Sequence, residues 1–214
     1  MTTRTVLNGD DRFVKPLLPW FDESDIADIK QAYNLAKSAH YKQFRQDGRR
    51  YFEHVRGVAL IAINELKVHQ VFSRKIAKAI IIAALFHDLK EDRPWVLSLK
   101  SMSKLFSSIV SDAVRLLTKD EDSKPVYFPR MMASRNIIVL IVKLCDRLYN
   151  MRDLNACSPE KKSKQVRETE EFVIPLSLLL ETLLLKRQKS VAIFLRKKLI
   201  EVCKKVSSSL VRGN

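Results

Sequence analysis

The chain has 214 residues, of which 46% are hydrophobic and 29% are charged. This length and composition are typical of one folded domain and exclude a disordered chain. The chain has only four glycines and seven prolines, which excludes collagen-like and linker-dominated architectures. This scarcity, together with the low aromatic content, favours helices over a small all-β fold. We therefore expect a compact, all-α helical bundle.

The chain is strongly basic, because 39 Lys and Arg residues against 24 Asp and Glu residues give a formal net charge of +15. Such an excess attracts anions, including nucleotides, pyrophosphate, RNA and anionic membrane surfaces. For the basic C-terminal stretch, residues 186–212, a solvated surface is the simpler interpretation. A second cluster lies beside the candidate chemistry and is expected to bind an anionic ligand; it comprises Lys42, Arg45, Arg49, Arg50 and Arg56.

Three widely spaced cysteines, Cys145, Cys157 and Cys203, form no CxxC motif. Neither a structural zinc site nor a disulfide framework is therefore expected. The polar N-terminal segment lacks the apolar core of a signal peptide. The longest apolar runs, residues 79–86 and 137–142, are shorter than the about 20 residues that span a bilayer. We expect a cytoplasmic protein without a membrane span.

Apolar periodicity predicts a series of helices along the chain. The expected helices cover about residues 22–40, 51–66, 74–90, 98–118, 158–185 and 191–206, with a further helix through residues 137–142. Asp22 or Ser24 can cap the first of them. The apolar runs at residues 79–86 and 137–142 are also compatible with buried strands, but both continue into charged residues without a Gly or Pro break. We assign both runs to helices.

Prolines mark the remaining boundaries. Residues 120–129 contain two prolines and are predicted to form a loop. Ser158 and Pro159 give a strong helix start, and Pro175 is expected to kink the helix that follows. We expect a single domain over residues 1–214, with a core at about 22–185 and a basic C-terminal helix at about 186–212.

His87 and Asp88 lie at the polar end of the apolar third helix, and Glu91 and Asp92 follow at once. On a continuous helix His87 shares a face with Glu91, and Asp88 shares a face with Asp92. Carboxylates and an imidazole this close together are costly when partly buried, and a bound divalent cation removes that cost. The alternative interpretation is a solvated acidic helix end with an unrelated histidine.

Asp146 follows the second apolar run, and His54 lies in the first turn of the second predicted helix. Alone, Asp146 could equally pair with a neighbouring arginine, and His54 could be a packed core histidine. Together with His87 and Asp88 they offer two imidazoles and two carboxylates from three helices. Such mixed donors suit Mn²⁺, Fe²⁺ or Zn²⁺ better than Ca²⁺, and the ion would lower the pKa of a bound water and polarise a phosphoryl oxygen.

These residues stand in three ordered blocks that resemble the hydrolase domain of RelA/SpoT homologues and the small alarmone hydrolases, a branch of the HD superfamily of metal-dependent phosphohydrolases. The family pattern A-x-x-x-H-x-x-Q-x-R-x-x-G-x-x-Y-x-x-H is matched by Ala36, His40, Gln43, Arg45, Gly48, Tyr51 and His54. The pattern A-A-L-x-H-D-x-x-E-D is matched at residues 83–92, and K-L-A-D-R-L-x-N-x-R at residues 143–152, with Cys145 in place of the third residue. The resemblance spans about residues 27–180.

The resemblance implies an HD-domain helical bundle and a role for each matching residue. One Mn²⁺ is expected to be bound by His54, His87, Asp88 and Asp146. Glu91 and Asp92 match the pair that orients and activates the attacking water. Substrate-binding roles are implied for Arg45 against a guanine base, and for Tyr51, Asn150 and Lys143. Gln46 and Asp47 depart from the residues common in the family, which leaves the base selectivity open.

The implied reaction is removal of the 3′-pyrophosphate of ppGpp or pppGpp, which yields pyrophosphate and GDP or GTP. No synthetase-like region is seen, so a hydrolase-only enzyme is expected, with a nucleotide substrate and no nucleic-acid partner. One alternative keeps the metal and changes the substrate, for example to NADPH. Another is a non-catalytic basic module that binds RNA through residues 186–212. Release of pyrophosphate, release of inorganic phosphate and salt-sensitive RNA binding distinguish the three.

Overall fold

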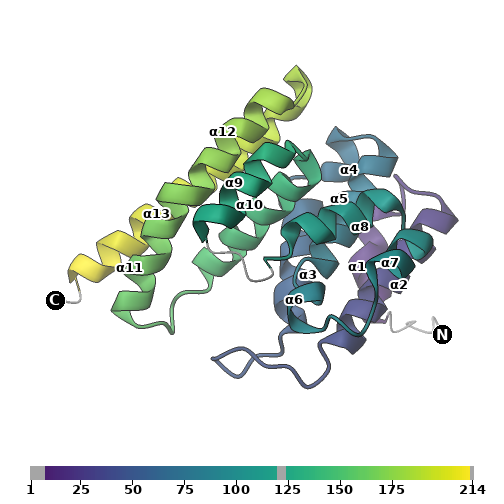
Figure 1. The fold of residues 1–214 in the computed structure, drawn as a ribbon, viewed down its shortest axis with the longest axis horizontal. Coiled ribbons are helices and arrows are strands. Elements are labelled where there is room, and N and C mark those ends of the chain that lie inside the picture. Colours follow the sequence, from purple (N-terminus) through teal and green to yellow (C-terminus); the bar gives the residue numbers. More distant parts are fainter. Residues whose placement is uncertain (1–7, 120–123, 213–214) are drawn as a thin grey trace, which may run out of the picture.

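The structure is a computed structural model that describes residues 8–119 and 124–212, and in this part of the chain it consists of helices and loops without a named strand (Figure 1). The α-helices are α1 (Gly9–Val14), α2 (Glu23–Ala39), α3 (Phe52–Leu60), α4 (Val68–Val71), α5 (Arg74–Phe86), α6 (Leu89–Asp92), α7 (Leu99–Leu105), α8 (Ser108–Leu117), α9 (Lys124–Ser134), α10 (Ile137–Arg152), α11 (Pro159–Glu168), α12 (Ile174–Leu183) and α13 (Lys189–Arg212). The predicted all-α fold is confirmed.

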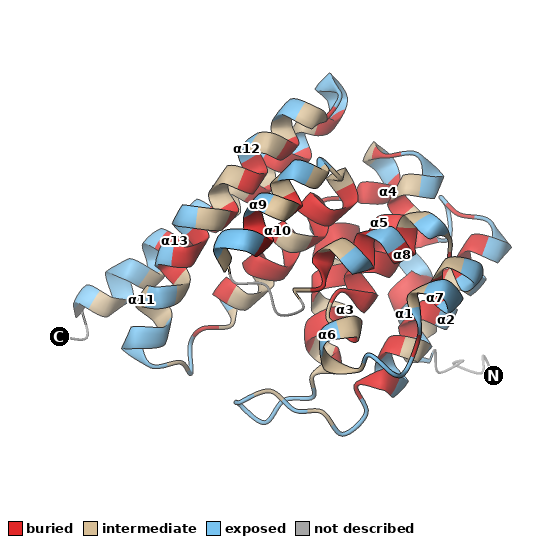
Figure 2. Ribbon diagram, in the orientation of Figure 1, coloured by how far each residue is buried: buried red, intermediate tan, exposed pale blue. Residues whose placement is uncertain are grey.

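Helix α5 lies at the centre of the bundle and packs against α2, α3, α8 and α10. Residues 79–86 of α5 and residues 138–142 of α10 are all buried, and they form much of the red interior in Figure 2. The assignment of both apolar runs to helices rather than strands is therefore confirmed. A run that is apolar on every side fits a helix enclosed by neighbours all round.

A second layer covers α10 on one side. Helix α13 packs against α10, α11 and α12, and these C-terminal helices lie together at the left of Figure 1, opposite α1 to α8. The N-terminal segment also enters the main core through Phe13, Val14 and Leu17, ahead of the expected core start at about residue 22. Among the described helices none is both long and apolar enough to cross a bilayer.

Two predicted helix starts are confirmed by their caps. The Asp22 side chain accepts a hydrogen bond from the Asp25 backbone N–H, and the Ser158 side chain accepts one from Lys161 N–H. The helix after Ser158 continues through a π-helical turn, Thr169–Val173, into α12. This irregular turn ends two residues before Pro175, where the sequence predicts a kink. A proline supplies no N–H to the preceding turn.

Three predicted boundaries are wrong. The helix expected over residues 74–90 is interrupted by a turn at His87 and Asp88, between α5 and α6. The helix expected over residues 98–118 is two helices, α7 and α8. It breaks at Ser107, whose φ of 136° lies outside the helical region and whose side chain caps α8 at Val110 N–H.

The third wrong boundary is the loop expected over residues 120–129. Residues 120–123 lie outside the described part of the chain, but residues 124–129 are helical and belong to α9. Pro125 lies in the first turn, where a helix needs no N–H donor. Pro129 lies inside α9 at a cost in backbone hydrogen bonding. Burial of Tyr127, Phe128 and Met131 offsets that cost.

Candidate metal centre and active site

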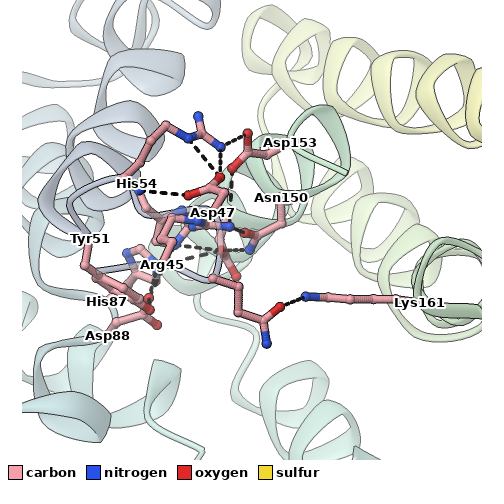
Figure 3. Close-up of polar contacts among 12 residues, drawn as sticks. Arg45, Asp47, Tyr51, His54, His87, Asp88, Asn150, Asp153 and Lys161 are labelled. Carbon is pink, nitrogen blue, oxygen red and sulfur yellow. Dashed lines mark hydrogen bonds and ion pairs between the residues drawn. The ribbon is translucent and has the colours of Figure 1, made fainter. Parts of the chain in front are cut away.

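Four side chains from three separate segments converge at one point, as the sequence predicts. His54 comes from α3, His87 and Asp88 from the turn after α5, and Asp146 from α10. The Nε2 atom of His54 lies 3.2 Å from Nε2 of His87, 3.3 Å from Oδ2 of Asp88 and 3.4 Å from Oδ1 of Asp146 (Figure 3). The Nε2 atom of His87 lies 3.0 Å from Asp88 Oδ2.

These distances match a site for a metal ion. His54, His87 and Asp146 each offer a ligand atom, the three atoms lie within 4.8 Å of one another, and all three residues are buried. The Nδ1 atom of His87 lies 2.8 Å from the Ala84 carbonyl oxygen, so Nδ1 carries the proton and Nε2 keeps its lone pair in the neutral ring. The donor set of nitrogen and oxygen atoms fits a divalent transition metal.

The electrostatics of the cluster point the same way. Burial alone would raise the pKa of both carboxylates. The imidazole of His87 nevertheless holds the pKa of Asp88 well below its usual range, and Lys143 and His87 together lower the pKa of Asp146 in the same way. Burial also opposes protonation of His87, yet the two carboxylates raise its pKa well above the usual value. The cluster therefore favours positive charge at its centre, which a divalent cation supplies.

Neighbouring side chains hold the two carboxylates in place. Tyr51 donates its hydroxyl hydrogen bond to Asp88 Oδ2 at 2.7 Å, and Asn150 Nδ2 donates to Asp146 Oδ1 at 2.6 Å. Lys143 Nζ lies 3.0 Å from Asp146 Oδ2. Metal ligands in proteins are commonly oriented by such partners.

A cavity of about 660 Å³ opens over the cluster. Its floor includes His54, Asp88 and Asp146. It is also lined by residues 44–47 of the loop between α2 and α3, and by Asp153 and residues 156–158 at the junction of α10 and α11. Lys161 of α11 reaches across to this loop, because its Nζ donates to Gln46 Oε1 at 2.6 Å, as Figure 3 shows.

The structure brings most of the predicted substrate residues to this cavity. Arg45, Tyr51 and Asn150 line it, and Arg45 Nη2 donates to Asn150 Oδ1 at 3.1 Å. Lys143 does not line it. Its ammonium group lies behind the cluster, paired with Asp146 and 5.5 Å from the centre of the Tyr127 ring.

The two predicted catalytic carboxylates point in different directions. Glu91 accepts a hydrogen bond from the Lys119 backbone N–H at 2.6 Å, and Asp92 accepts one from Gln43 Nε2 at 2.9 Å. Neither is among the residues that line the cavity. Burial raises the pKa of Glu91 above its ordinary value. This shift brings the pKa closer to neutral pH, where a general base is most effective.

Three residues with contacts at or beside the cavity, Tyr149, Asp153 and Lys161, were not predicted to have a role. Tyr149 places its ring 5.1 Å from the ring of His54 and 6.0 Å from the guanidinium of Arg45. Asp153 forms ion pairs with Arg45, at 3.4 Å, and with Arg49. Asp153 lies one turn after Asn150, so its helical spacing was an available signal. No sequence signal indicates that Lys161 meets the loop, because that contact is made only in the folded chain.

The sequence profile of the HD domain matches residues 32–177, which is more than half of the chain. The chain belongs to the HD-domain family. The three predicted motif blocks, from Ala36 to Arg152, all lie inside the matched region.

Curated relatives of this HD domain confirm the predicted resemblance to the RelA/SpoT branch. The bifunctional (p)ppGpp synthase/hydrolase SpoT of Escherichia coli K12 is 30% identical over 177 residues, which cover 78% of this chain and 23% of that protein. A guanosine-3′,5′-bis(diphosphate) 3′-pyrophosphohydrolase of Haemophilus influenzae is 29% identical over 153 residues, covering 67% and 21%. The chain therefore spans about a quarter of the length of the curated relatives it matches.

A solved structure has the same fold. It is described as a metazoan ortholog of SpoT that hydrolyzes ppGpp, and it superposes with a TM-score of 0.62 at 23% sequence identity. The match covers 84% of this chain and 95% of that one. At this level of identity the match confirms the helical HD fold.

Proposed function

We propose that this HD domain is a divalent-metal-dependent hydrolase that removes the 3′-pyrophosphate of ppGpp or pppGpp and releases GDP or GTP. The observation that carries the proposal is the convergence of His54, His87, Asp88 and Asp146 at a cavity that Arg45 and three of the four, His54, Asp88 and Asp146, line. Support also comes from the relatives, several of which are named as 3′-pyrophosphohydrolases of guanosine-3′,5′-bis(diphosphate).

In this proposal the four converging residues hold one Mn²⁺ per chain. When bound, the ion supplies a water of lowered pKa and polarises a phosphoryl oxygen. Tyr51 and Asn150 fix the orientation of the two carboxylate ligands through the hydrogen bonds described above. We assign Lys143 to holding Asp146 rather than to contacting substrate, since it is paired with that carboxylate and lies outside the cavity lining.

Glu91 and Asp92 are assigned to proton handling. A base with a pKa raised toward neutrality accepts a proton from an attacking water more effectively, and burial moves the pKa of Glu91 in that direction. Asp92, which accepts a hydrogen bond from Gln43, is assigned to orienting that water. Both assignments rest on the match of these residues to the family motif.

Arg45 is assigned to the nucleotide base. Its Nη2 atom contacts both Asn150 and Asp153, and its guanidinium lies over the ring of Tyr149. A planar guanidinium held in this way can stack on a purine. Because Asp153 neutralises much of its charge, Arg45 is better suited to a base than to a phosphate group.

The test is product analysis with purified protein. The protein is stripped with a chelator, reloaded with Mn²⁺ and given ppGpp. We expect pyrophosphate and GDP, no reaction before reloading, and no reaction from the reloaded variants His87→Ala and Asp146→Ala. Asp112→Ala is the matched control, because Asp112 is an exposed carboxylate on α8 outside the cavity.

The other outcomes assign the chain differently. Inorganic phosphate from NADPH, with ppGpp untouched, would identify a nucleotide phosphatase that uses the same metal. Salt-sensitive RNA binding by a protein that hydrolyses neither nucleotide would favour the basic C-terminal helix as the functional surface.

A further inference from the structure

A buried histidine outside the metal cluster is linked to one of the proposed catalytic carboxylates. His40 caps the C-terminal end of α2 and is only 2% exposed. Its Nδ1 atom lies 2.8 Å from Gln43 Oε1, and Gln43 Nε2 lies 2.9 Å from Asp92 Oδ2. Gln43 therefore bridges His40 and Asp92, residues 52 positions apart in the chain.

The chemistry of the three groups fixes the direction of these hydrogen bonds. An ionised carboxylate only accepts, so the NH₂ group of Gln43 must face Asp92 and its carbonyl oxygen must face His40. His40 Nδ1 must then carry the proton that this oxygen accepts. Burial lowers the pKa of His40, which is consistent with a neutral ring protonated at Nδ1. Donation runs one way, from His40 to Gln43 to Asp92.

The same unit is packed against the metal cluster. The ring of His40 stacks on the ring of Tyr51, with centroids 5.0 Å apart and planes 27° from parallel. The Tyr51 hydroxyl in turn donates to Asp88. His40 is therefore linked through Tyr51 to Asp88, a proposed metal ligand, and through Gln43 to Asp92, a proposed catalytic carboxylate.

We propose that Gln43 and His40 are positioning residues that fix the Asp92 carboxylate relative to the metal cluster. This inference rests on the proposed hydrolase function. Gln43 acts directly on Asp92, and His40 acts through Gln43 by fixing which way the amide faces. A misplacement of about 1 Å in a reacting group can cost on the order of 100-fold in rate, so the loss of this bridge is expected to be visible in kcat.

The experiment compares three substitutions in the manganese-loaded full chain with ppGpp as substrate. Gln43→Met keeps the length of the side chain and removes the donor. Gln43→Glu keeps the shape and places a carboxylate against Asp92. His40→Phe keeps a ring against Tyr51 and removes the Nδ1 proton. Gln43 is a partly exposed loop residue, so its variants are expected to fold. They therefore test the bridge to Asp92 even where His40→Phe lowers stability.

We expect Gln43→Met to lower kcat about 10- to 100-fold, with KM and Mn²⁺ affinity within about twofold of the wild type. Gln43→Glu is expected to lower kcat further, because two carboxylates then face each other. The double variant His40→Phe/Gln43→Met is expected to lose no more than Gln43→Met alone. Non-additivity of this kind is the signature of residues that act in series.

Two matched controls separate this effect from general damage. Gln31→Met makes the same change at an exposed position of α2, and His69→Phe replaces a buried histidine that packs edge-on against Trp20. Both are expected to retain the wild-type kcat. Unchanged kcat in both Gln43 variants, a rise in KM without loss of kcat, or additive losses in the double variant would overturn the inference. A wild type inactive on ppGpp would instead contradict the proposed function on which it rests.

Discussion

Gly57 and Tyr149 are in such close contact that a Cβ atom at position 57 would lie 2.0 Å from Cε2 of the Tyr149 ring. Real Cβ atoms do not approach another heavy atom so closely. The absence of a side chain at Gly57 of α3 thus leaves room for the Tyr149 ring, which also contacts His54 and Arg45. Gly57 is therefore coupled to the metal cluster although it carries no functional group.

Substitution of Gly57 by alanine is expected to push the Tyr149 ring out of place. Overpacking of this kind typically costs about 1–3 kcal/mol of unfolding free energy. We expect Gly57→Ala to lower the midpoint of thermal unfolding and to weaken Mn²⁺ binding. The double variant Gly57→Ala/Tyr149→Ala should lose less stability than the sum of the two single changes, because the clash is gone. If the stability losses of the two single variants simply add in the double variant, the Tyr149 ring is not what excludes a side chain at position 57.

Removal of the metal is expected to lower the stability of the wild type, but not that of a variant that lacks one of the proposed metal-binding side chains. A ligand present at about 100 times its Kd stabilises the folded state by about 2.7 kcal/mol. A chelator should therefore lower the thermal midpoint of the manganese-loaded wild type and leave Asp146→Asn unchanged. Calorimetric titration should give one Mn²⁺ per wild-type chain and none for Asp146→Asn. The control His69→Ala, a histidine outside the cluster, should still bind one ion.

The activity is expected to fall on the acidic side as Glu91 gains a proton. Burial raises the pKa of Glu91 above its ordinary value of 4.5. The base is active above this raised pKa and is lost as the pH falls through it. With Mn²⁺ kept saturating, kcat/KM should show an acid limb at a pH above 4.5.

Glu91→Gln tests the origin of this limb, since the amide oxygen can still accept the Lys119 N–H hydrogen bond. Loss of a general base typically costs 10²- to 10⁴-fold, so we expect kcat to fall by about 10² or more. The residual activity should no longer show the acid limb. An unchanged limb in Glu91→Gln would assign it to another group.

Arg45→Lys is expected to affect substrate binding more than chemistry. Lysine is a point charge and cannot offer a planar group that stacks on a base while it bonds to Asn150 and Asp153. We expect KM for ppGpp to rise about tenfold with kcat within about twofold, measured by initial rates. Arg115→Lys, at an exposed position of α8, is the control. A loss confined to kcat would place Arg45 at the reacting phosphate instead.

Local pattern predicted which four side chains converge, because each belongs to a short block with its own spacing. His87 and Asp88 are adjacent in the chain, and the apolar runs that carry them and Asp146 into the interior are visible in the sequence. What local pattern could not supply are contacts between segments. The pairing of Lys143 with Asp146 behind the cluster and the link from His40 to Asp92 both depend on how the helices pack.

One of the wrong helix boundaries also depends on tertiary packing. Prolines usually end a helix, so a loop was predicted where α9 forms. Tertiary burial of Phe128 and Met131 outweighs that local preference. The break at Ser107 has the opposite cause, since its side chain caps α8 and so favours a new helix over continuation of α7.

The most direct measurement is anomalous diffraction at the manganese edge from crystals grown with Mn²⁺. It tests whether the four converging side chains hold one ion. We predict a single anomalous peak bounded by His54 Nε2, His87 Nε2 and the carboxylates of Asp88 and Asp146, and no peak in crystals of His87→Ala. A strong peak elsewhere, or none at this cluster in a protein that hydrolyses ppGpp with manganese, would contradict the proposed metal centre.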